Sequence, residues 1–150
     1  MRWWPFRRRP KPGSRRLLVP FAGGTLDSTV LDAAIRIARA DDATLVPAYL
    51  LRIPYQYAED SPLIEQVAVA MPLLEAVEHA ALRAGVPVDA RIEKGRSPTH
   101  ALRKLWEVEA FDRVLAPAPA GNNGGFSLKD ITWILEHAPA ETLILRPAPH

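Results

Sequence analysis

Short apolar runs alternate with segments of helical period along most of this chain, and this alternation limits the fold more than any other feature. The largely apolar runs lie at residues 16–21, 43–51, 86–93, 113–116 and 142–145. Between them, helices are predicted near 28–40, 62–84, 98–109 and 128–137. Apolar strands that alternate with helices are typical of a parallel sheet covered on both faces. We therefore expect an α/β fold, with a five-stranded, mainly parallel sheet in a three-layer α/β/α sandwich.

Several polar and special residues mark where the predicted helices begin and end. Thr25 or Asp27 can cap the first helix, and Ser127 with Asp130 three residues later forms a capping box for the last. In the second helix, Pro72 should kink or divide the segment because proline removes a backbone donor. Gly85 is a plausible C-terminal stop for that helix.

Charge divides the chain into a basic tail and an acidic body. Seven of the 19 basic residues lie within residues 1–16, where there is no acidic residue, so residues 17–150 carry a net charge of −5. Residues 1–14 also hold three prolines and show no helical or strand period. We predict a disordered tail over 1–14 and one domain over 15–147.

Aromatic and basic side chains are interleaved in the tail. This composition suits an anionic membrane surface, where tryptophan prefers the interface and arginine meets lipid phosphates. It also suits single-stranded nucleic acid, a less favoured partner, or aromatic residues that fold back onto the body. The candidate residues are Arg2, Trp3, Trp4, Phe6, Arg7, Arg8 and Arg9.

The chain contains no cysteine, no apolar run of membrane-spanning length and no signal-peptide segment. Disulfides and cysteine nucleophiles are therefore excluded, and we expect a cytoplasmic protein. The four histidines have no metal-ligand spacing, and no serine has a sequence context that supplies a base. Glu107 and Glu109 are expected to be solvated. These observations predict no metal site and no enzyme, although weak ATP hydrolysis stays open.

Three stretches give the body a family resemblance. LLVPFAGG, IEKGRSP, and FDRVLAP through HAPAETLILRP occur in an order and spacing that resembles the universal stress protein family over about residues 16–147. The resemblance implies a five-stranded parallel α/β sandwich and, for many members, ATP binding. It also implies a homodimer formed through the last strand, at Thr142, Leu143, Ile144 and Leu145.

The nucleotide motif of that family is altered in this chain. Ala22 stands where nucleotide binders carry an aspartate that meets the adenosine. Pro117 and Ala120 stand at the two glycines of the phosphate loop, and Leu128 and Lys129 replace its later glycine–hydroxyl pair. Alanine cannot accept a hydrogen bond through its side chain, and proline has no N–H to donate to a phosphate. These substitutions predict a degenerate nucleotide site.

One shifted match keeps a nucleotide site open. A G-x-x-G pattern occurs a few residues later, and the loop residues that would then contact nucleotide are Gly121, Asn122, Asn123, Gly124, Gly125, Ser127 and Lys129. An asparagine–glycine loop is more often a turn. We therefore expect a non-enzymatic, dimeric regulatory or interaction module with no cofactor. The alternatives are a divergent ATP sensor that uses this loop and a peripheral membrane adaptor recruited by the tail.

Overall fold

The computed structural model describes residues 15–119 and 125–148. Its elements alternate strictly between strand and helix. The strands are β1 (Arg15–Phe21), β2 (Ala43–Arg52), β3 (Arg91–Gly95), β4 (Arg113–Pro117) and β5 (Glu141–Leu145). The helices are α1 (Ser28–Asp41), α2 (Ile64–Arg83), α3 (Pro98–Val108) and α4 (Leu128–His137). No helix in these two ranges is long and apolar enough to cross a bilayer.

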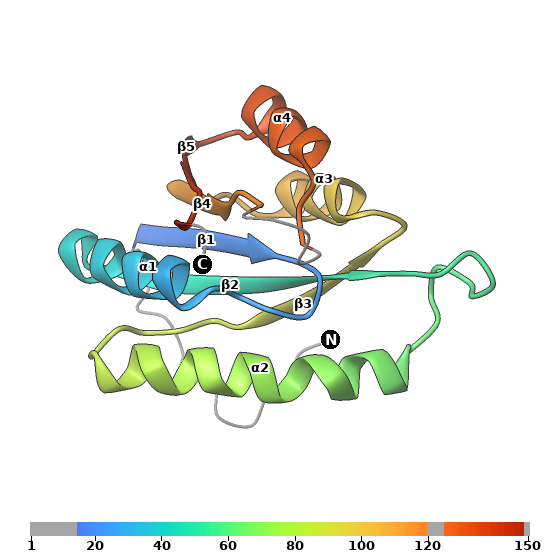
Figure 1. Cartoon of the computed structure of the whole chain (residues 1–150), viewed down its shortest axis with the longest axis horizontal. Coiled ribbons are helices and arrows are strands. Elements are labelled where there is room, and N and C mark those ends of the chain that lie inside the picture. The colour runs from blue at the N-terminus through green and yellow to red at the C-terminus, as the bar shows by residue number, and fades with distance from the viewer. Residues whose placement is uncertain (1–14, 120–124, 149–150) are drawn as a thin grey trace.

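The five strands form one parallel sheet in the order β3-β2-β1-β4-β5. Helices α1 and α2 cover one face of this sheet, and α3 and α4 cover the other (Figure 1). The side chains of β1 alternate between the two cores: Leu17 and Val19 pack under α1 and α2, while Leu18 packs under α3 and α4. The predicted three-layer α/β/α sandwich is confirmed.

The third strand lies later in the chain than the apolar pattern predicts. Residues 86–93 were the expected strand, but β3 runs from Arg91 to Gly95. Val88 makes only an isolated bridge to Leu45. Pro87 has no N–H, so the ladder to β2 cannot run evenly through it. Val86 and Val88 are buried although they lie outside β3, so their apolar side chains reflect burial and not strand formation.

The sequence predicts a kink or a division at Pro72, and the division is wrong because α2 is a single helix. The helix continues from Ile64 to Arg83 through the proline (Figure 1). Pro72 is exposed, and buried residues lie on both sides of it: Val67, Ala70, Leu74, Val77 and Ala81. Their burial against the sheet holds the two halves in one helix despite the missing backbone donor.

The junction between β3 and α3 is tightly packed. Gly95 ends β3, and Ser97 caps α3 by accepting a hydrogen bond from the backbone N–H of His100. A Cβ added at Gly95 would lie 2.6 Å from the backbone nitrogen of Ala101. The first turn of α3 therefore approaches the strand as closely as a glycine allows.

Candidate functional site

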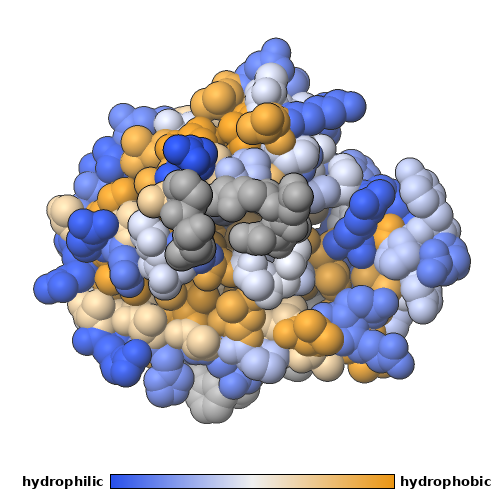
Figure 2. Space-filling view, in the orientation of Figure 1, coloured by the Kyte–Doolittle hydropathy of each residue, from blue (hydrophilic) through white to orange (hydrophobic). Residues whose placement is uncertain are grey.

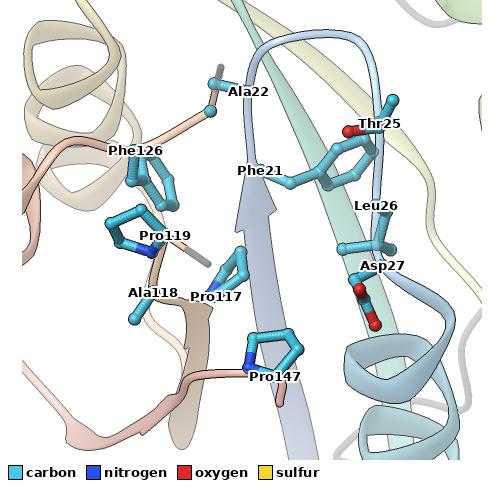
Figure 3. Close-up of a pocket in the computed structure, with 11 residues that line it drawn as sticks. Phe21, Ala22, Thr25, Leu26, Asp27, Pro117, Ala118, Pro119, Phe126 and Pro147 are labelled. Atoms are coloured by element: carbon cyan, nitrogen blue, oxygen red, sulfur yellow. The ribbon is translucent and has the colours of Figure 1, made fainter. Parts of the chain in front are cut away.

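A cleft opens where the strand order of the sheet reverses. The chain moves from β1 outward to β2 and β3, then returns to the other side of β1 for β4 and β5. In open parallel sheets, ligands bind beyond the carboxyl ends of the strands at this switch point. Here a cavity of about 220 Å³ lies at the ends of β1 and β4 (Figure 3). It is lined by Phe21, Ala22, Thr25, Leu26, Asp27, Pro117, Ala118, Pro119, Gly125, Phe126 and Pro147.

Most of the cleft wall is apolar and poor in hydrogen-bond donors. Ala22 follows β1 directly and is buried, so the side chain at this position offers the cleft only a methyl group. Pro117, Pro119 and Pro147 gather on the β4 and β5 side of the cleft (Figure 3). Each lacks an N–H. Phosphate sites in comparable folds use backbone N–H groups at this position, and these three residues of the described wall supply none.

The N-terminus of α1 at the cleft already holds a carboxylate. Asp27 lines the cavity and caps the helix, and its Oδ1 accepts a hydrogen bond from the backbone N–H of Thr29 at 2.7 Å. Asp27 rather than Thr25 is therefore the cap. The carboxylate of Asp27 engages the backbone N–H of Thr29 and complements the positive end of the helix dipole. It also repels an anion that approaches the N-terminus of α1.

Helix α4 also has a carboxylate at its N-terminus, as part of a capping box. Ser127 Oγ accepts from the backbone N–H of Asp130 at 3.1 Å, and the N–H of Ser127 donates to Asp130 Oδ2 at 2.9 Å. The predicted capping box is confirmed. The backbone donor of Ser127 is therefore engaged within the chain, beside a negative charge.

The sequence-predicted site residues are only partly brought together. Ala22, Pro117 and Gly125 line the cleft. Ser127, Leu128 and Lys129 are exposed at the start of α4 and do not line it. Ala120, Gly121, Asn122, Asn123 and Gly124 lie outside the described residues, as does the whole tail with Arg2, Trp3, Trp4, Phe6, Arg7, Arg8 and Arg9. The lining residues Phe126 and Pro147, which come from separate loops, were not predicted.

The proposed dimer edge, Thr142 to Leu145, lies in β5 at one edge of the sheet. Leu143 is 37% exposed there. Leu128 and Leu135 on α4 are also exposed, which leaves apolar side chains on the last helix as well as on the last strand.

A buried ionic cluster, also missed in the sequence, lies near the amino ends of β1 and β3. The Arg91 guanidinium contacts Asp89 at 2.8 Å and pairs with both carboxylate oxygens of Glu109. Arg16 joins Asp89 at 3.3 Å. Arg91 is 8% exposed and Asp89 1%. The expectation that Glu109 is merely solvated is wrong, because it neutralises a buried charge.

The pKa values of two groups in this cluster shift in the folded protein. Burial opposes the charge on Arg91, but the hydrogen bonds and charges of Glu109 and Asp89 together raise the pKa of its guanidinium above the ordinary value. Burial also raises the pKa of Glu93, which the nearby charge of Arg91 opposes and that of Glu109 reinforces. The enclosed pairing of Arg91 indicates a structural role for the cluster.

Comparisons with known proteins show where this fold occurs. No family model and no curated protein sequence matches the chain. Among solved structures, a universal stress protein family member from Burkholderia pseudomallei superposes with a TM-score of 0.62 at 20% identity, covering 91% of this chain and 98% of that one. The Archaeoglobus fulgidus universal stress protein in complex with dAMP gives 0.63 at 12% identity, with 87% and 96% covered.

An Arabidopsis thaliana universal stress protein family protein with AMP bound gives a TM-score of 0.58 at 15% identity, covering 88% of this chain and 91% of that one. All three cover nearly the whole length of both chains, although few of their residues are identical to those of this chain. The chain has the fold of the universal stress proteins.

Proposed function

We propose that this protein is a non-enzymatic regulatory or interaction module whose switch-point cleft does not hold a nucleotide by its phosphates. The observation that carries this proposal is a carboxylate at each of two helix N-termini: Asp27 caps α1, and Asp130 completes the capping box of α4 with Ser127. In nucleotide sites of parallel sheets, the phosphates receive donors from a loop and a helix N-terminus. Here the chain's own acidic side chains engage those helix ends.

The composition of the cleft supports the same conclusion. A triphosphate placed between the ends of β1 and β4 would meet Pro117 and Pro119 instead of backbone N–H groups, with Asp27 facing the same cavity. Buried phosphate oxygens need both hydrogen bonds and positive charge. The prolines therefore weaken phosphate binding because they lack donors, and Asp27 weakens it further because it is negatively charged. Ala22 removes the acceptor expected for the adenosine end.

We further propose that the module is a homodimer formed through β5. Within the described residues, β5 pairs only with β4, so its outer edge presents unpaired backbone groups. An uncovered edge strand invites pairing with another strand. Exposed Leu143, Leu128 and Leu135 supply apolar side chains for such a contact.

A nucleotide sensor is the second candidate, and two observations favour it. Two structural neighbours are complexes with dAMP and AMP. In this chain Gly125 has φ +79° and lines the cleft, a conformation in which backbone N–H groups can approach an anion. In that case the loop 121–127 would hold the nucleotide, with ATP as the expected ligand.

A third candidate is a peripheral membrane adaptor, which depends on the composition of the tail alone. Replacing Arg7, Arg8 and Arg9 by Gln in the full chain should then abolish binding to vesicles that contain phosphatidylserine. Vesicle binding that survives this change would contradict the adaptor hypothesis.

Nucleotide content tests the main proposal. The protein is purified natively and denatured, and the supernatant is analysed for released nucleotide, followed by titration of the native protein with ATP, AMP and cAMP in the presence of magnesium. We expect no released nucleotide, no saturable binding and no ATP turnover above that of the Lys129→Ala variant. Stoichiometric or micromolar binding that is lost in Gly125→Ala would overturn the proposal and support the sensor.

A further inference from the structure

Helix α2 has an outer surface that is unusually apolar for an exposed helix. Six positions between Ile64 and Ala76 are exposed, and Glu65 is the only charged one. Ile64 is 74% exposed and Val69 71%. Ala68, Pro72 and Ala76 complete this surface, which we call the α2 patch. Figure 2 shows pale and deep orange atoms along the lower part of the molecule, where α2 lies in Figure 1.

The patch is a property of α2 and not of every helix on this face of the sheet. Helix α1 covers the same face and also has six exposed positions, but Ala40 is the only apolar one among them. A solvated helix normally presents polar residues outward, as α1 does. An exposed helix surface with a single charged residue, as on α2, is typical of a surface that binds another molecule or segment.

The segment before Arg15 has a length that fits this surface. Arg15 opens β1 at the end of the sheet where α2 finishes, at Arg83 (Figure 1). Helix α2 has 20 residues and is therefore about 30 Å long. The residues from Trp3 to Ser14 include three prolines, and in an extended conformation this segment would span about 37 Å. It is therefore long enough to reach from Arg15 to the start of α2.

The chemistry of the segment also complements the patch. Trp3, Trp4 and Phe6 carry large apolar rings, and each ring can bury roughly 150–250 Å². The acidic residues Glu59 and Asp60 just before α2 and Glu65 in its first turn are exposed, on the side where Arg2 would lie if the segment runs from Arg15 along α2 toward Ile64. The net charge of −5 on residues 17–150 favours approach of the basic segment from any direction.

We propose that the segment 1–14 docks along α2 of its own chain, with Trp3, Trp4 and Phe6 on the patch around Ile64 and Val69. Arg2, which precedes the rings, then lies beside the acidic residues at the start of the helix. The patch is thereby an intramolecular binding surface for a basic aromatic segment. A partner with the same alternation of aromatic and basic residues would compete for it.

A fluorescent reporter on the patch tests the proposal in the full chain. Because the chain contains no cysteine, Ala68→Cys provides a single site for bimane, a dye that nearby tryptophan quenches on contact. Arg36→Cys, an exposed position on α1, is the matched control. We expect bimane at position 68 to be quenched, and to lose that quenching when Trp3→Ala and Trp4→Ala are introduced. The label at position 36 should not respond.

A second pair of variants tests the surface itself. Ile64→Glu with Val69→Glu should abolish the quenching at position 68, because two charges make the patch unfavourable for the rings. Val108→Glu changes a residue on α3 that is 77% exposed and should leave the quenching intact. Cooperative thermal unfolding of each variant confirms that the body is folded.

Three results would overturn the proposal. Equal brightness at position 68 with and without the tail tryptophans would show that the segment does not lie on α2. Quenching that appears only as protein concentration rises would assign the patch to a second copy. Binding of the tail to phosphatidylserine vesicles with no quenching at position 68 in their absence would assign the tail to a membrane.

Discussion

At the scale of single residues, the buried Arg91 is the strongest departure from what the sequence suggests. A charged residue at the start of a strand is ordinarily assigned to solvent, and the partners of Arg91 are scattered along the chain. Glu109 lies 18 residues after Arg91 in the sequence. Asp89 also pairs with Arg16, which lies 73 residues before it. Such pairing depends on how strands and helices meet, which no local pattern records. The cleft residues Ala22 and Pro117 could be placed from the sequence, because Ala22 directly follows β1 and Pro117 ends β4.

Removing Arg91 should destabilise the protein far more than removing an arginine near the surface. Arg91→Ala leaves the carboxylates of Asp89 and Glu109 without their main cation, and such losses cost about 3–5 kcal/mol. Arg113→Ala, which removes the ion pairs with Asp41 and Glu141, should cost about 1 kcal/mol or less. Urea unfolding compares the two free energies, and equal losses would contradict the structural role of the cluster.

Glu93 gives the stability a dependence on pH. Burial raises its pKa above the ordinary 4.5 in the folded protein, so the folded state retains a proton that the unfolded state has released. Stability must then fall as the pH rises through the interval between the two pKa values. Glu93→Gln removes this loss, so the melting temperature of the variant relative to the wild type should increase from pH 4 toward neutrality. A difference that is constant, or that decreases with pH, would refute this assignment.

At the scale of elements, the sequence predicts the existence and type of every strand and helix, because buried strands and amphipathic helices leave different periodicities. The errors occur where tertiary packing decides the outcome. Pro72 stays within α2 because the sheet holds both halves of that helix. Residues 86–90 are buried without forming a regular strand, since Pro87 interrupts the ladder. Burial and strand pairing produce the same apolar pattern, so the pattern alone cannot separate them.

The junction of β3 and α3 should not tolerate a side chain at its glycine. In Gly95→Ala the new Cβ would lie 2.6 Å from the nitrogen and 2.9 Å from the Cα of Ala101, and backbone atoms can yield only if α3 shifts. We expect a loss of about 1–3 kcal/mol in the free energy of unfolding. Gly85→Ala is the control: it has φ +77° and open space around it, so its cost of about 1 kcal/mol is backbone strain alone. The reverse ranking in urea unfolding would disprove close packing at Gly95.

At the scale of the whole molecule, the strand order places the cleft at one end of β1 and an unpaired strand at one side of the sheet. With this order, right-handed crossovers place the helices before and after the reversal on opposite faces of the sheet. Whether β5 pairs with a second copy depends on its outer edge, which pairs with no other strand among the described residues. The sequence could identify the last strand, but it could not show that Leu128 and Leu135 on α4 are exposed as well.

A charge on the outer edge of β5 should separate the proposed dimer. Leu143→Arg puts a cation on the edge strand, which protects natural edges from pairing. Light scattering after size-exclusion chromatography should give the mass of a dimer for the wild type and of a monomer for this variant, while Val108→Arg on α3 should remain dimeric. Unchanged mass in Leu143→Arg would place the interface elsewhere.

The central position of β1 also determines the order in which the protein can assemble during synthesis. Its first neighbour, β2, follows after one helix, but its second neighbour is β4, and Asp112 at the start of that pairing is 96 residues after Arg16. A growing chain therefore exposes one edge of its central strand until most of the polypeptide has been translated. Pairings this distant in sequence slow folding and prolong the life of aggregation-prone intermediates. We expect newly made chains that end before β4 to require a chaperone until the second half of the sheet arrives.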